Sequence, residues 1–364
     1  MSKAPPGIKL LWIRGKGKID FKRPKTHLGL GLRGAGKSSL LESVACRYPK
    51  VIDLFGSRDN EGLAWLRSKL YSKNEILLLT GDSVEVGGPW DVQPVSKITV
   101  KDLEPYRNSL SVSAFYSNIN EEFWALNELI LKTLWRRASW REPWYVMIRE
   151  AANFIYSRIR ITKNQTIAKA DFIHVYREAR HLGYPIGVDT VRWTSIDKEI
   201  RDLSDYTYIK RVGVLGLPKD LSWIYSMVDP DSLMNPGPSL FILVCSTGPV
   251  ALGKFEYPAW HKREKENILK AVGLEGCIQY GELPEHLQKA ERSHQVGPIE
   301  HTQIIERYLE CKNMKVVAAD LKRSSGTVHT HIANHNREIR ANGHCSRCRR
   351  MSSPLEAQIL EIGR

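Results

Sequence analysis

A phosphate-binding loop is the clearest chemical signature of this sequence. Residues Gly31–Ser38 are GLRGAGKS and match the pattern G-x-x-x-x-G-K-[ST] in full. Glycines at these positions let successive backbone N–H groups turn toward phosphate oxygens, and the helix that follows adds the partial positive charge of its N-terminus. Lys37 can reach the β- and γ-phosphates of ATP, and Ser38 can ligate Mg²⁺. The expected nucleotide-binding residues are Gly31, Arg33, Gly34, Ala35, Gly36, Lys37, Ser38 and Ser39.

The acid that hydrolysis needs is expected at the end of a second apolar segment, WYVMIRE at residues 144–150. The usual pattern ends in Asp-Glu, where the Asp holds Mg²⁺ through water and the Glu polarises the attacking water. Here Arg149 stands at the Asp position, and Glu150 stands at the Glu position. Either Glu150 serves both roles, or another acid such as Asp53 supports the metal, or hydrolysis is weak. An ordinary core strand capped by an Arg-Glu pair is the structural alternative.

A third polar segment follows the strand expected at residues 184–189. Polar residues at the C-terminal end of a parallel strand face the ligand crevice. Thr190 is therefore a candidate sensor of the γ-phosphate. Arg192 or Arg201 could stabilise charge on the transferring phosphoryl group, in the same subunit or in a neighbour. For each arginine, a surface salt bridge is the alternative. The candidate catalytic residues are Lys37, Glu150, Arg192 and Arg201.

Strands and helices alternate around these motifs, which predicts an α/β fold. The expected architecture is a RecA-like P-loop ATPase core with a mostly parallel sheet covered on both faces. Short apolar segments are expected as strands at 27–32, 50–55, 76–79, 144–149, 184–189, 206–211 and 240–245, with one more possible at 8–13. Helices are expected at 37–47, 60–72, 121–138, 150–158, 167–182 and 196–203.

Length and composition describe an ordinary globular protein. The 364 residues suggest roughly two or three domains. Hydrophobic residues make up 42% and charged residues 26% of the chain. No apolar run approaches the ~18 residues of a membrane span. The N-terminus lacks the pattern of a signal peptide, and the six cysteines do not form a disulfide framework, so a cytoplasmic protein is expected.

The net charge of +14 is concentrated in two segments. Residues 1–26 carry eight Lys/Arg and one Asp, a net charge of +7. Residues 320–350 carry seven Lys/Arg and two acidic residues, a net charge of +5. Two concentrated patches favour a polyanionic partner such as double-stranded DNA, with solvated tails as the alternative.

The C-terminal segment has the pattern of a small all-α helix-turn-helix domain. Helices are expected at 301–311 and 314–321, and a third begins near Ser325. Such a third helix can enter the major groove, while basic residues beside it contact phosphates. A helical cap that packs on the core or joins subunits is the alternative. The candidate DNA-binding residues are Lys322, Arg323, Ser324, Ser325, Thr327, His329, Thr330 and Arg337.

Cys345 and Cys348 follow this segment at the C-x-x-C spacing, which is half of a zinc site. His331 and His335, four residues apart on one helix face, are the nearest further candidates and would complete a His₂Cys₂ set. Two free thiols with unrelated histidines are the alternative. Zn²⁺ is therefore a possible cofactor besides ATP and Mg²⁺.

Residues 27–262 resemble the HerA/FtsK branch of P-loop ATPases, which includes DNA translocases, conjugation coupling ATPases and viral genome-packaging motors. The segment HLGYPIGVDTVRWTSIDKEIRDLSDYTYIKR at 181–211 is similar to the family's Thr-Gln-Arg sensor region, with Val191 at the Gln position. The other parts that carry the resemblance are the phosphate loop, residues 50–60 with Asp53 and Arg58-Asp59, and the strand that ends in Glu150.

The resemblance implies a homo-oligomer, a hexameric ring that pulls duplex DNA. The family's large N-terminal barrel has no counterpart in the 26 residues before the core, so compact packaging-type or archaeal plasmid- and virus-like members match better. The expected domains are a basic arm (1–26), the ATPase (27–262), a connector (263–298), the helix-turn-helix domain (299–340) and a Cys-pair tail (341–364).

Two hypotheses of function follow. The first is an ATP-dependent DNA translocase or packaging motor that hydrolyses ATP to move or remodel duplex DNA. The second is a nucleotide-switched, sequence-specific DNA-binding regulator with little hydrolysis, which Arg149 at the metal-supporting position favours. A small-molecule kinase is disfavoured because the core has no recognisable substrate lid.

Overall fold

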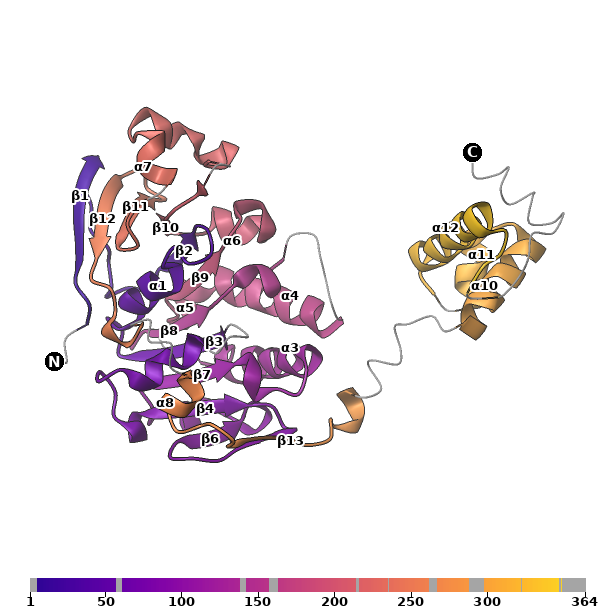
Figure 1. Ribbon diagram of the computed structural model, residues 1–364, viewed down its shortest axis with the longest axis horizontal. Coiled ribbons are helices and arrows are strands. Elements are labelled where there is room, and N and C mark those ends of the chain that lie inside the picture. The colour runs from indigo at the N-terminus through magenta and orange to yellow at the C-terminus, as the bar shows by residue number, and fades with distance from the viewer. Residues whose placement is uncertain are drawn as a thin grey trace. The chain divides into compact units, whose positions relative to one another are not determined.

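The computed structural model describes residues 5–56, 61–137, 142–156, 163–213, 216–234, 236–261, 267–287, 298–321, 323–346 and 348. The chain divides into two compact units, Met1–Pro284 and Glu285–Arg364. The first unit holds the sheet and the phosphate loop, and the second holds the C-terminal helices (Figure 1).

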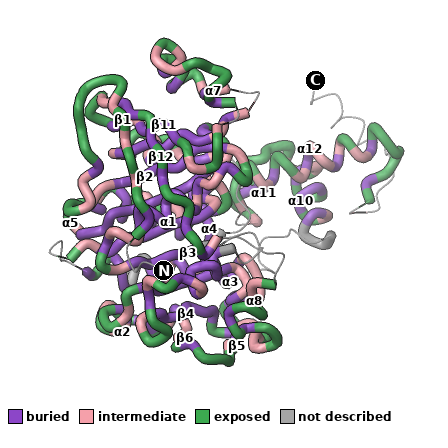
Figure 2. The backbone as a smooth tube through the Cα atoms, turned by 60° about the vertical axis from the view of Figure 1, so that its left-hand side comes forward, coloured by how far each residue is buried: buried purple, intermediate pink, exposed green. Residues whose placement is uncertain are grey.

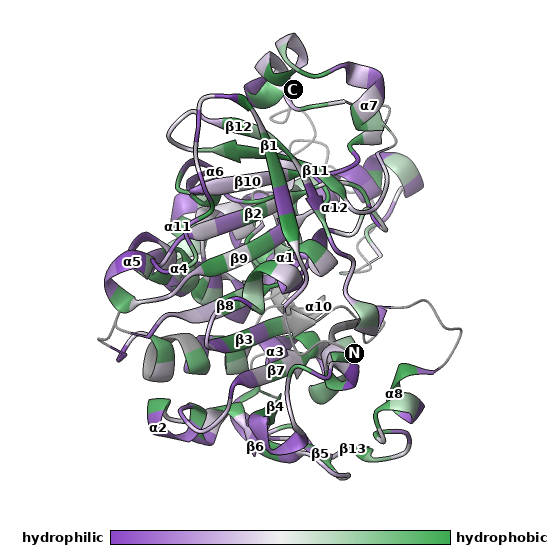
Figure 3. Ribbon diagram, turned by 90° about the vertical axis from the view of Figure 1, so that its left-hand side faces the viewer, coloured by the Kyte–Doolittle hydropathy of each residue, from purple (hydrophilic) through white to green (hydrophobic). Residues whose placement is uncertain are grey.

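A large sheet forms the centre of the first unit. Within the described residues it has eleven strands in the order β1-β12-β11-β10-β2-β9-β8-β3-β7-β4-β6, which Figure 3 shows nearly face on. Neighbours are parallel from β10 to β6, and antiparallel from β1 to β10. The strands are β1 (Ile8–Arg14), β2 (Thr26–Leu30), β3 (Lys50–Gly56), β4 (Ile76–Thr80), β6 (Asp91–Pro94), β7 (Asn108–Val112), β8 (Trp144–Ile148), β9 (Ile186–Thr190), β10 (Tyr206–Ile209), β11 (Leu240–Cys245) and β12 (Val250–Phe255).

The central parallel strands are buried on both faces, which gives the mixed α/β fold with a mostly parallel sheet that the alternating pattern predicted. Every residue of β2, β4, β8 and β9 is buried, and Figure 2 shows this buried centre beneath exposed loops. Strand β7 is buried as well, although its sequence NSLSV is mostly polar. Apolar patterning alone could not identify it.

Helices cover the sheet and position the loops at its edge. Helix α1 (Lys37–Ala45) packs on β2, β8 and β9, directly behind the phosphate loop. Helices α3 (Ile119–Glu128) and α4 (Lys163–Arg177) pack on each other. The shorter helices are α2 (Val100–Leu103), α5 (Ala179–Leu182), α6 (Lys198–Asp202) and α7 (Pro230–Met234).

Several expected elements differ in the structure. The N-terminal segment is not a free arm, because β1 pairs with β12 and closes one edge of the sheet. The helix expected at 60–72 is a 3₁₀ helix, η1 (Glu61–Arg67). In place of the helix expected at 150–158, the described part shows only the 3₁₀ turn η6 (Ala151–Asn153). Helix α3 continues as a π-helix, Leu129–Leu134.

Much of the expected connector belongs to the first unit. Helix α8 is Ile268–Ala271, and β13 (Ile278–Tyr280) pairs antiparallel with β5 (Val84–Val86). The Trp90 indole N–H donates to the Val272 carbonyl at 2.9 Å. The boundary between the two units therefore lies at Pro284, since backbone pairing holds the preceding residues against the sheet unit.

The second unit contains three helices within the described residues: α10 (Pro298–Cys311), α11 (Met314–Asp320) and α12 (Ser325–Asn342). Side chains cap two of them, because Asn313 accepts from the backbone of α11 and Ser324 accepts from Thr327 N–H at the start of α12. Their shared core is small and comprises Ile304, Ile305, Tyr308, Val317, Ala318, Val328 and Ile332. No helix in the described parts of the chain is both long and apolar enough to cross a membrane.

Candidate active site

The phosphate loop joins β2 to α1 and is held from both neighbouring strands. The Gly31 N–H donates to the Thr190 carbonyl beside β9, and the Leu32 N–H donates to the Arg211 carbonyl beyond β10. Gly36, at φ 82°, caps α1 in the left-handed conformation that glycine adopts without strain. A Cβ at this position would lie 3.0 Å from the Pro238 carbonyl oxygen. The loop therefore needs glycine for both its conformation and its packing.

The sheet order places the chemical groups at one edge. Strands β10, β2, β9, β8 and β3 are parallel neighbours, so their C-terminal ends meet where α1 begins. Lys37 is only 5% exposed, and its ammonium group donates to the Leu32 carbonyl at 3.2 Å. This brings Lys37 and Ser38 together with the ends of the strands that carry Glu150 and Thr190.

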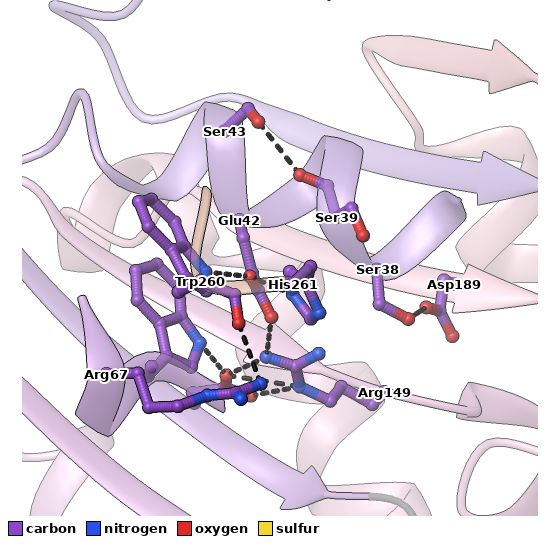
Figure 4. A network of polar contacts seen from close by, with 11 residues as sticks. Ser38, Ser39, Glu42, Ser43, Arg67, Arg149, Asp189, Trp260 and His261 are labelled. Carbon is purple, nitrogen blue, oxygen red and sulfur yellow. Dashed lines mark hydrogen bonds and ion pairs between the residues drawn. The ribbon is translucent and has the colours of Figure 1, made fainter. Parts of the chain in front are cut away.

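Asp189 is the acid that the structure places beside Ser38. The Ser38 hydroxyl donates to Asp189 Oδ2 at 2.7 Å (Figure 4). The Glu150 backbone N–H donates to Asp189 Oδ1 at 2.6 Å. Asp189 lies in β9 and is fully buried. Sequence reasoning missed this residue, although an Asp inside an apolar strand is itself a signal, since strands are depleted in Asp.

Glu150 follows β8 directly and has an unusual backbone. Its φ and ψ are both 48°, in the left-handed region that non-glycine residues rarely occupy. Such conformations cost about 1–2 kcal/mol and concentrate at functional sites. The hydrogen bond from its N–H to Asp189 stabilises this turn. Glu150 is half-buried at the edge where the phosphate loop lies.

Arg149 points into the protein rather than toward the loop. It is 2% exposed, and its guanidinium contacts both oxygens of Asp53, with the shortest contact at 2.6 Å, and also pairs with Glu42. Asp53 accepts a further hydrogen bond from the Trp65 indole at 2.5 Å. Asp53 therefore has the partners that a buried carboxylate needs, and its support of Mg²⁺ stays a prediction.

Glu42 completes a buried ion cluster, which we define as Glu42, Asp53, Arg149 and His261. The second oxygen of Glu42 accepts from the Trp260 indole at 2.7 Å and contacts His261 Nε2 at 2.5 Å. Burial alone would raise the pKa of Glu42, but His261 and Arg149 outweigh it and lower that pKa to about 2. Burial raises the pKa of Asp53 despite Arg149. Two carboxylates thus share two basic partners.

The ion cluster lies one helical turn from Ser38. Ser38 and Glu42 are four residues apart on α1, so they leave the same face of the helix. Figure 4 shows Ser38 directed to Asp189 and Glu42 directed to Arg149. The cluster therefore fixes the position of α1 against β3 and β8.

Lys210 is a second lysine beside the loop that sequence reasoning did not identify. It follows β10, is 1% exposed, and its ammonium donates to the Pro238 carbonyl at 2.5 Å. Its Nζ lies 3.8 Å from where a Cβ of Gly36 would stand. Burial, with a contribution from Lys37, lowers the pKa of Lys210 to about 7.

The candidate arginines and Thr190 have other partners or face solvent. Arg201 pairs with Asp220 at 3.6 Å and lies over the Trp193 ring at 5.5 Å, which is the salt bridge considered as the alternative for this residue. Arg192 is exposed. Thr190 is buried, and its hydroxyl donates to the Arg192 carbonyl at 3.0 Å.

Two sets of candidates lie in the second unit. On α12 and just before it, Ser324, Ser325, His329, Thr330 and Arg337 are exposed. Arg323 and Thr327 are half-buried, and Lys322 lies outside the described residues. The metal candidates gather differently from the expected set: Cys345, Cys348 and His335 come together with His301, in the place expected for His331.

No protein-family model matches this sequence, and no curated protein matches it. Among solved structures, the chain is similar to the genome-packaging NTPase B204 of Sulfolobus turreted icosahedral virus 2 in complex with AMP, at 14% identity over 64% of this chain and 98% of that one, with a TM-score of 0.39. It is also similar to the pCW3 conjugation coupling protein TcpA, at 12% identity over 74% and 75%, with a TM-score of 0.36.

Proposed function

We propose that this chain is an ATP-dependent DNA translocase or packaging motor of the HerA/FtsK type. It binds ATP and Mg²⁺ at Gly31–Ser38 and couples hydrolysis to the movement of duplex DNA. The observation that carries the hydrolytic part is the Asp189 carboxylate, which joins the Ser38 hydroxyl to the Glu150 backbone. Asp189 would serve as the acid that is missing at position 149, where the usual Asp is replaced by Arg149.

The donor set fits the proposed metal. The Ser38 hydroxyl and the Asp189 carboxylate are oxygen donors, which Mg²⁺ prefers. When bound, Mg²⁺ would neutralise charge on the β- and γ-phosphate oxygens. Lys37 would turn from the Leu32 carbonyl to the phosphates, and the backbone N–H groups of the loop would hold them.

Glu150 is proposed as the general base. It orients the attacking water and accepts its proton, because its position after β8 places it at the same edge as the phosphate loop. Asp189 holds the Glu150 backbone and thereby acts as a positioning residue for it. Arg149 does not oppose this chemistry, since the ion cluster neutralises its charge inside the protein.

The DNA-binding part of the proposal rests on exposed positive charge. Lys9, Arg14, Lys16, Lys18, Lys22 and Arg23 are all exposed on β1 and the segment after it; we call these six residues the basic edge. The second unit adds exposed polar side chains on α12 and Arg337. Lysine and arginine on a surface of this kind neutralise phosphates without selecting a sequence. A ring of identical subunits is part of the proposal through the family resemblance.

The regulator remains the second candidate because α12 presents Ser325, His329 and Thr330 to solvent, as a recognition helix does. A regulator should protect a discrete DNA site, and a motor should bind duplexes with little sequence preference. Footprinting on a mixed-sequence duplex separates these two outcomes.

Steady-state ATP hydrolysis with and without long duplex DNA, at low and moderate salt, tests the proposal. We expect stimulation by duplex DNA that weakens as salt rises. Glu150→Gln should retain ATP binding and lose turnover by about 10²–10⁴-fold, whereas Lys37→Ala should lose nucleotide binding. Unchanged hydrolysis in both variants contradicts the site, and tight ATP binding with negligible turnover in the unaltered protein favours the regulator.

A further inference from the structure

Four metal-ligating side chains meet in the second unit. His301 lies in the first turn of α10, His335 lies in α12, and Cys345 and Cys348 lie beyond the end of α12. One ligand atom from each lies within 4.8 Å of the other three. Side chains from elements far apart in the sequence therefore meet at one point. Neither the C-x-x-C spacing nor the spacing of His331 and His335 predicts that His301 joins them.

Two of the six ligand-to-ligand separations match those around a tetrahedral zinc ion. Zn–S bonds of about 2.3 Å and Zn–N bonds of about 2.0–2.1 Å place neighbouring ligand atoms roughly 3.3–3.8 Å apart. Cys345 Sγ lies 3.4 Å from His301 Nε2, and Cys348 Sγ lies 3.5 Å from His335 Nδ1. Both pairs fall inside that range.

Most of the site is buried. His301, His335 and Cys345 are fully buried, and Cys348 is half-buried. Burying imidazole and thiol groups has a free-energy cost. A cation bound by all four side chains would offset that cost. Four protein ligands also leave no open coordination position, so the site suits a structural ion and not a catalytic one.

A neighbouring histidine explains the orientation of His301. With Nε2 facing Cys345, the ring directs Nδ1 to His331 Nδ1 at 3.0 Å. A ligating histidine commonly donates its other N–H to such a partner, which fixes the ring and its tautomer. His331 is therefore the hydrogen-bond partner of a ligand and not itself a ligand.

We propose that His301, His335, Cys345 and Cys348 bind one structural Zn²⁺ ion. The ion ties the start of α10 to α12 and to the residues that follow it. This matters because the core cluster has only seven buried side chains among the described residues of the unit, and domains this small commonly need a metal or disulfide for stability. The inference is independent of ATP hydrolysis.

The first test is the metal content of the full chain purified under reducing conditions. We expect one zinc per chain, and we expect His301→Ala and Cys345→Ser to lose it. His344→Ala is the matched control, because His344 adjoins Cys345 but is exposed, and its Nδ1 lies 3.0 Å from the Asn342 carbonyl oxygen. Retention in His301→Ala with loss in His331→Ala would overturn this ligand set. Absence of zinc in the unaltered chain would count against the site unless apo protein takes up the metal.

A second test does not depend on whether a variant folds. The metal-free chain is titrated with Co²⁺, and we expect intense visible bands of tetrahedral cobalt and near-ultraviolet thiolate bands that saturate at one ion per chain. All ten tryptophans lie at or before Trp260, so their fluorescence reports on the first unit alone. Chelation should lower the far-ultraviolet helical signal and leave tryptophan fluorescence unchanged. Octahedral cobalt spectra, or a chelator effect confined to tryptophan, would refute the proposal.

Discussion

At the scale of single residues, one carboxylate connects two motifs that are far apart in the sequence. Asp189 accepts from Ser38 at the phosphate loop and from the backbone of Glu150 after β8. The Asp189 carboxylate therefore fixes the Ser38 hydroxyl and the Glu150 backbone relative to each other. Arg149, at the place where an acid is usual, directs its charge inward to Asp53 and Glu42. In the proposed function, Asp189 supplies the acid that is absent at position 149.

Asp189→Asn tests this role. The amide keeps an oxygen for the Glu150 N–H but loses the charge that we propose supports Mg²⁺. We expect ATP turnover to fall by about 10–100-fold and the Mg²⁺ concentration for half-maximal rate to rise, as for losses around other metal sites. The measurement is a Mg²⁺ titration of the ATPase rate.

Asp53→Asn is the matched control for that titration, since it removes the same charge from the ion cluster. It breaks a buried pair with Arg149, so the free energy of unfolding should fall by about 3–5 kcal/mol. Its Mg²⁺ dependence should stay unchanged. The reverse pattern, with Asp53→Asn alone shifting the Mg²⁺ requirement, would return the metal-supporting role to Asp53.

The lowered pKa of Lys210 predicts that the protein takes up a proton when a nucleotide binds. Its pKa of about 7 in the free protein leaves the amine mostly neutral at pH 8. Nearby phosphates favour the charged amine and raise that pKa, so binding takes up a proton above pH 7 and weakens as pH rises. Calorimetry of ATP binding at pH 8, in two buffers with different ionisation enthalpies, measures this uptake. Lys210→Met should abolish it, and equal uptake in this variant would assign the proton to another group.

At the scale of elements, β2 carries a buried histidine, His27, that makes the stability of the first unit depend on pH. His27 Nδ1 lies 2.9 Å from the Tyr208 hydroxyl, and its Nε2 lies 3.2 Å from the Tyr48 hydroxyl. Burial lowers the pKa of His27 to about 3. The unfolded chain takes up a proton on this residue below about pH 6.5, but the folded chain does not until about pH 3. His27 therefore lowers stability as pH falls through that window.

From pH 7 to pH 5 this linkage should reduce the free energy of unfolding by about 2 kcal/mol. Urea unfolding followed by tryptophan fluorescence measures it in the first unit. His27→Gln keeps hydrogen-bonding groups but has no proton to gain, so its stability should change less over the same range. Glu42 does not contribute here, because its window lies between pH 4.5 and about 2. An identical pH dependence in both proteins would exclude His27 as the cause.

The elements also show why part of the site was predictable. The phosphate loop is contiguous, and β2, α1 and β8 have apolar patterns that local periodicity detects. Asp189 acts through the order β2-β9-β8, which no local pattern contains. Strand β7 was missed because its buried face is polar. His301 was missed because the side chains that gather with it lie in α12 or beyond its end, more than 30 residues along the chain.

At the scale of the whole molecule, the basic edge and the second unit supply positive charge from two separate bodies of the chain. Neutralising Lys16, Lys18 and Lys22 to Gln removes three exposed charges from the basic edge. If these lysines contact phosphates, each should contribute about 0.9 to the slope of log affinity against log salt concentration. We expect the magnitude of the slope to fall by about 2–3, measured by fluorescence anisotropy on a duplex with a non-hydrolysable ATP analogue.

The control variant removes the same number of positive charges from positions outside the basic edge. Lys69, Lys101 and Lys198 are exposed on other parts of the first unit, and their replacement by Gln should leave the slope nearly unchanged. Net charge alone would affect both triple variants alike, because long-range attraction depends on total charge and not on contact. Equal slopes in the two variants would therefore remove the basic edge from the DNA path. A loss confined to the first variant would place the duplex along the basic edge, at the segment that follows β1.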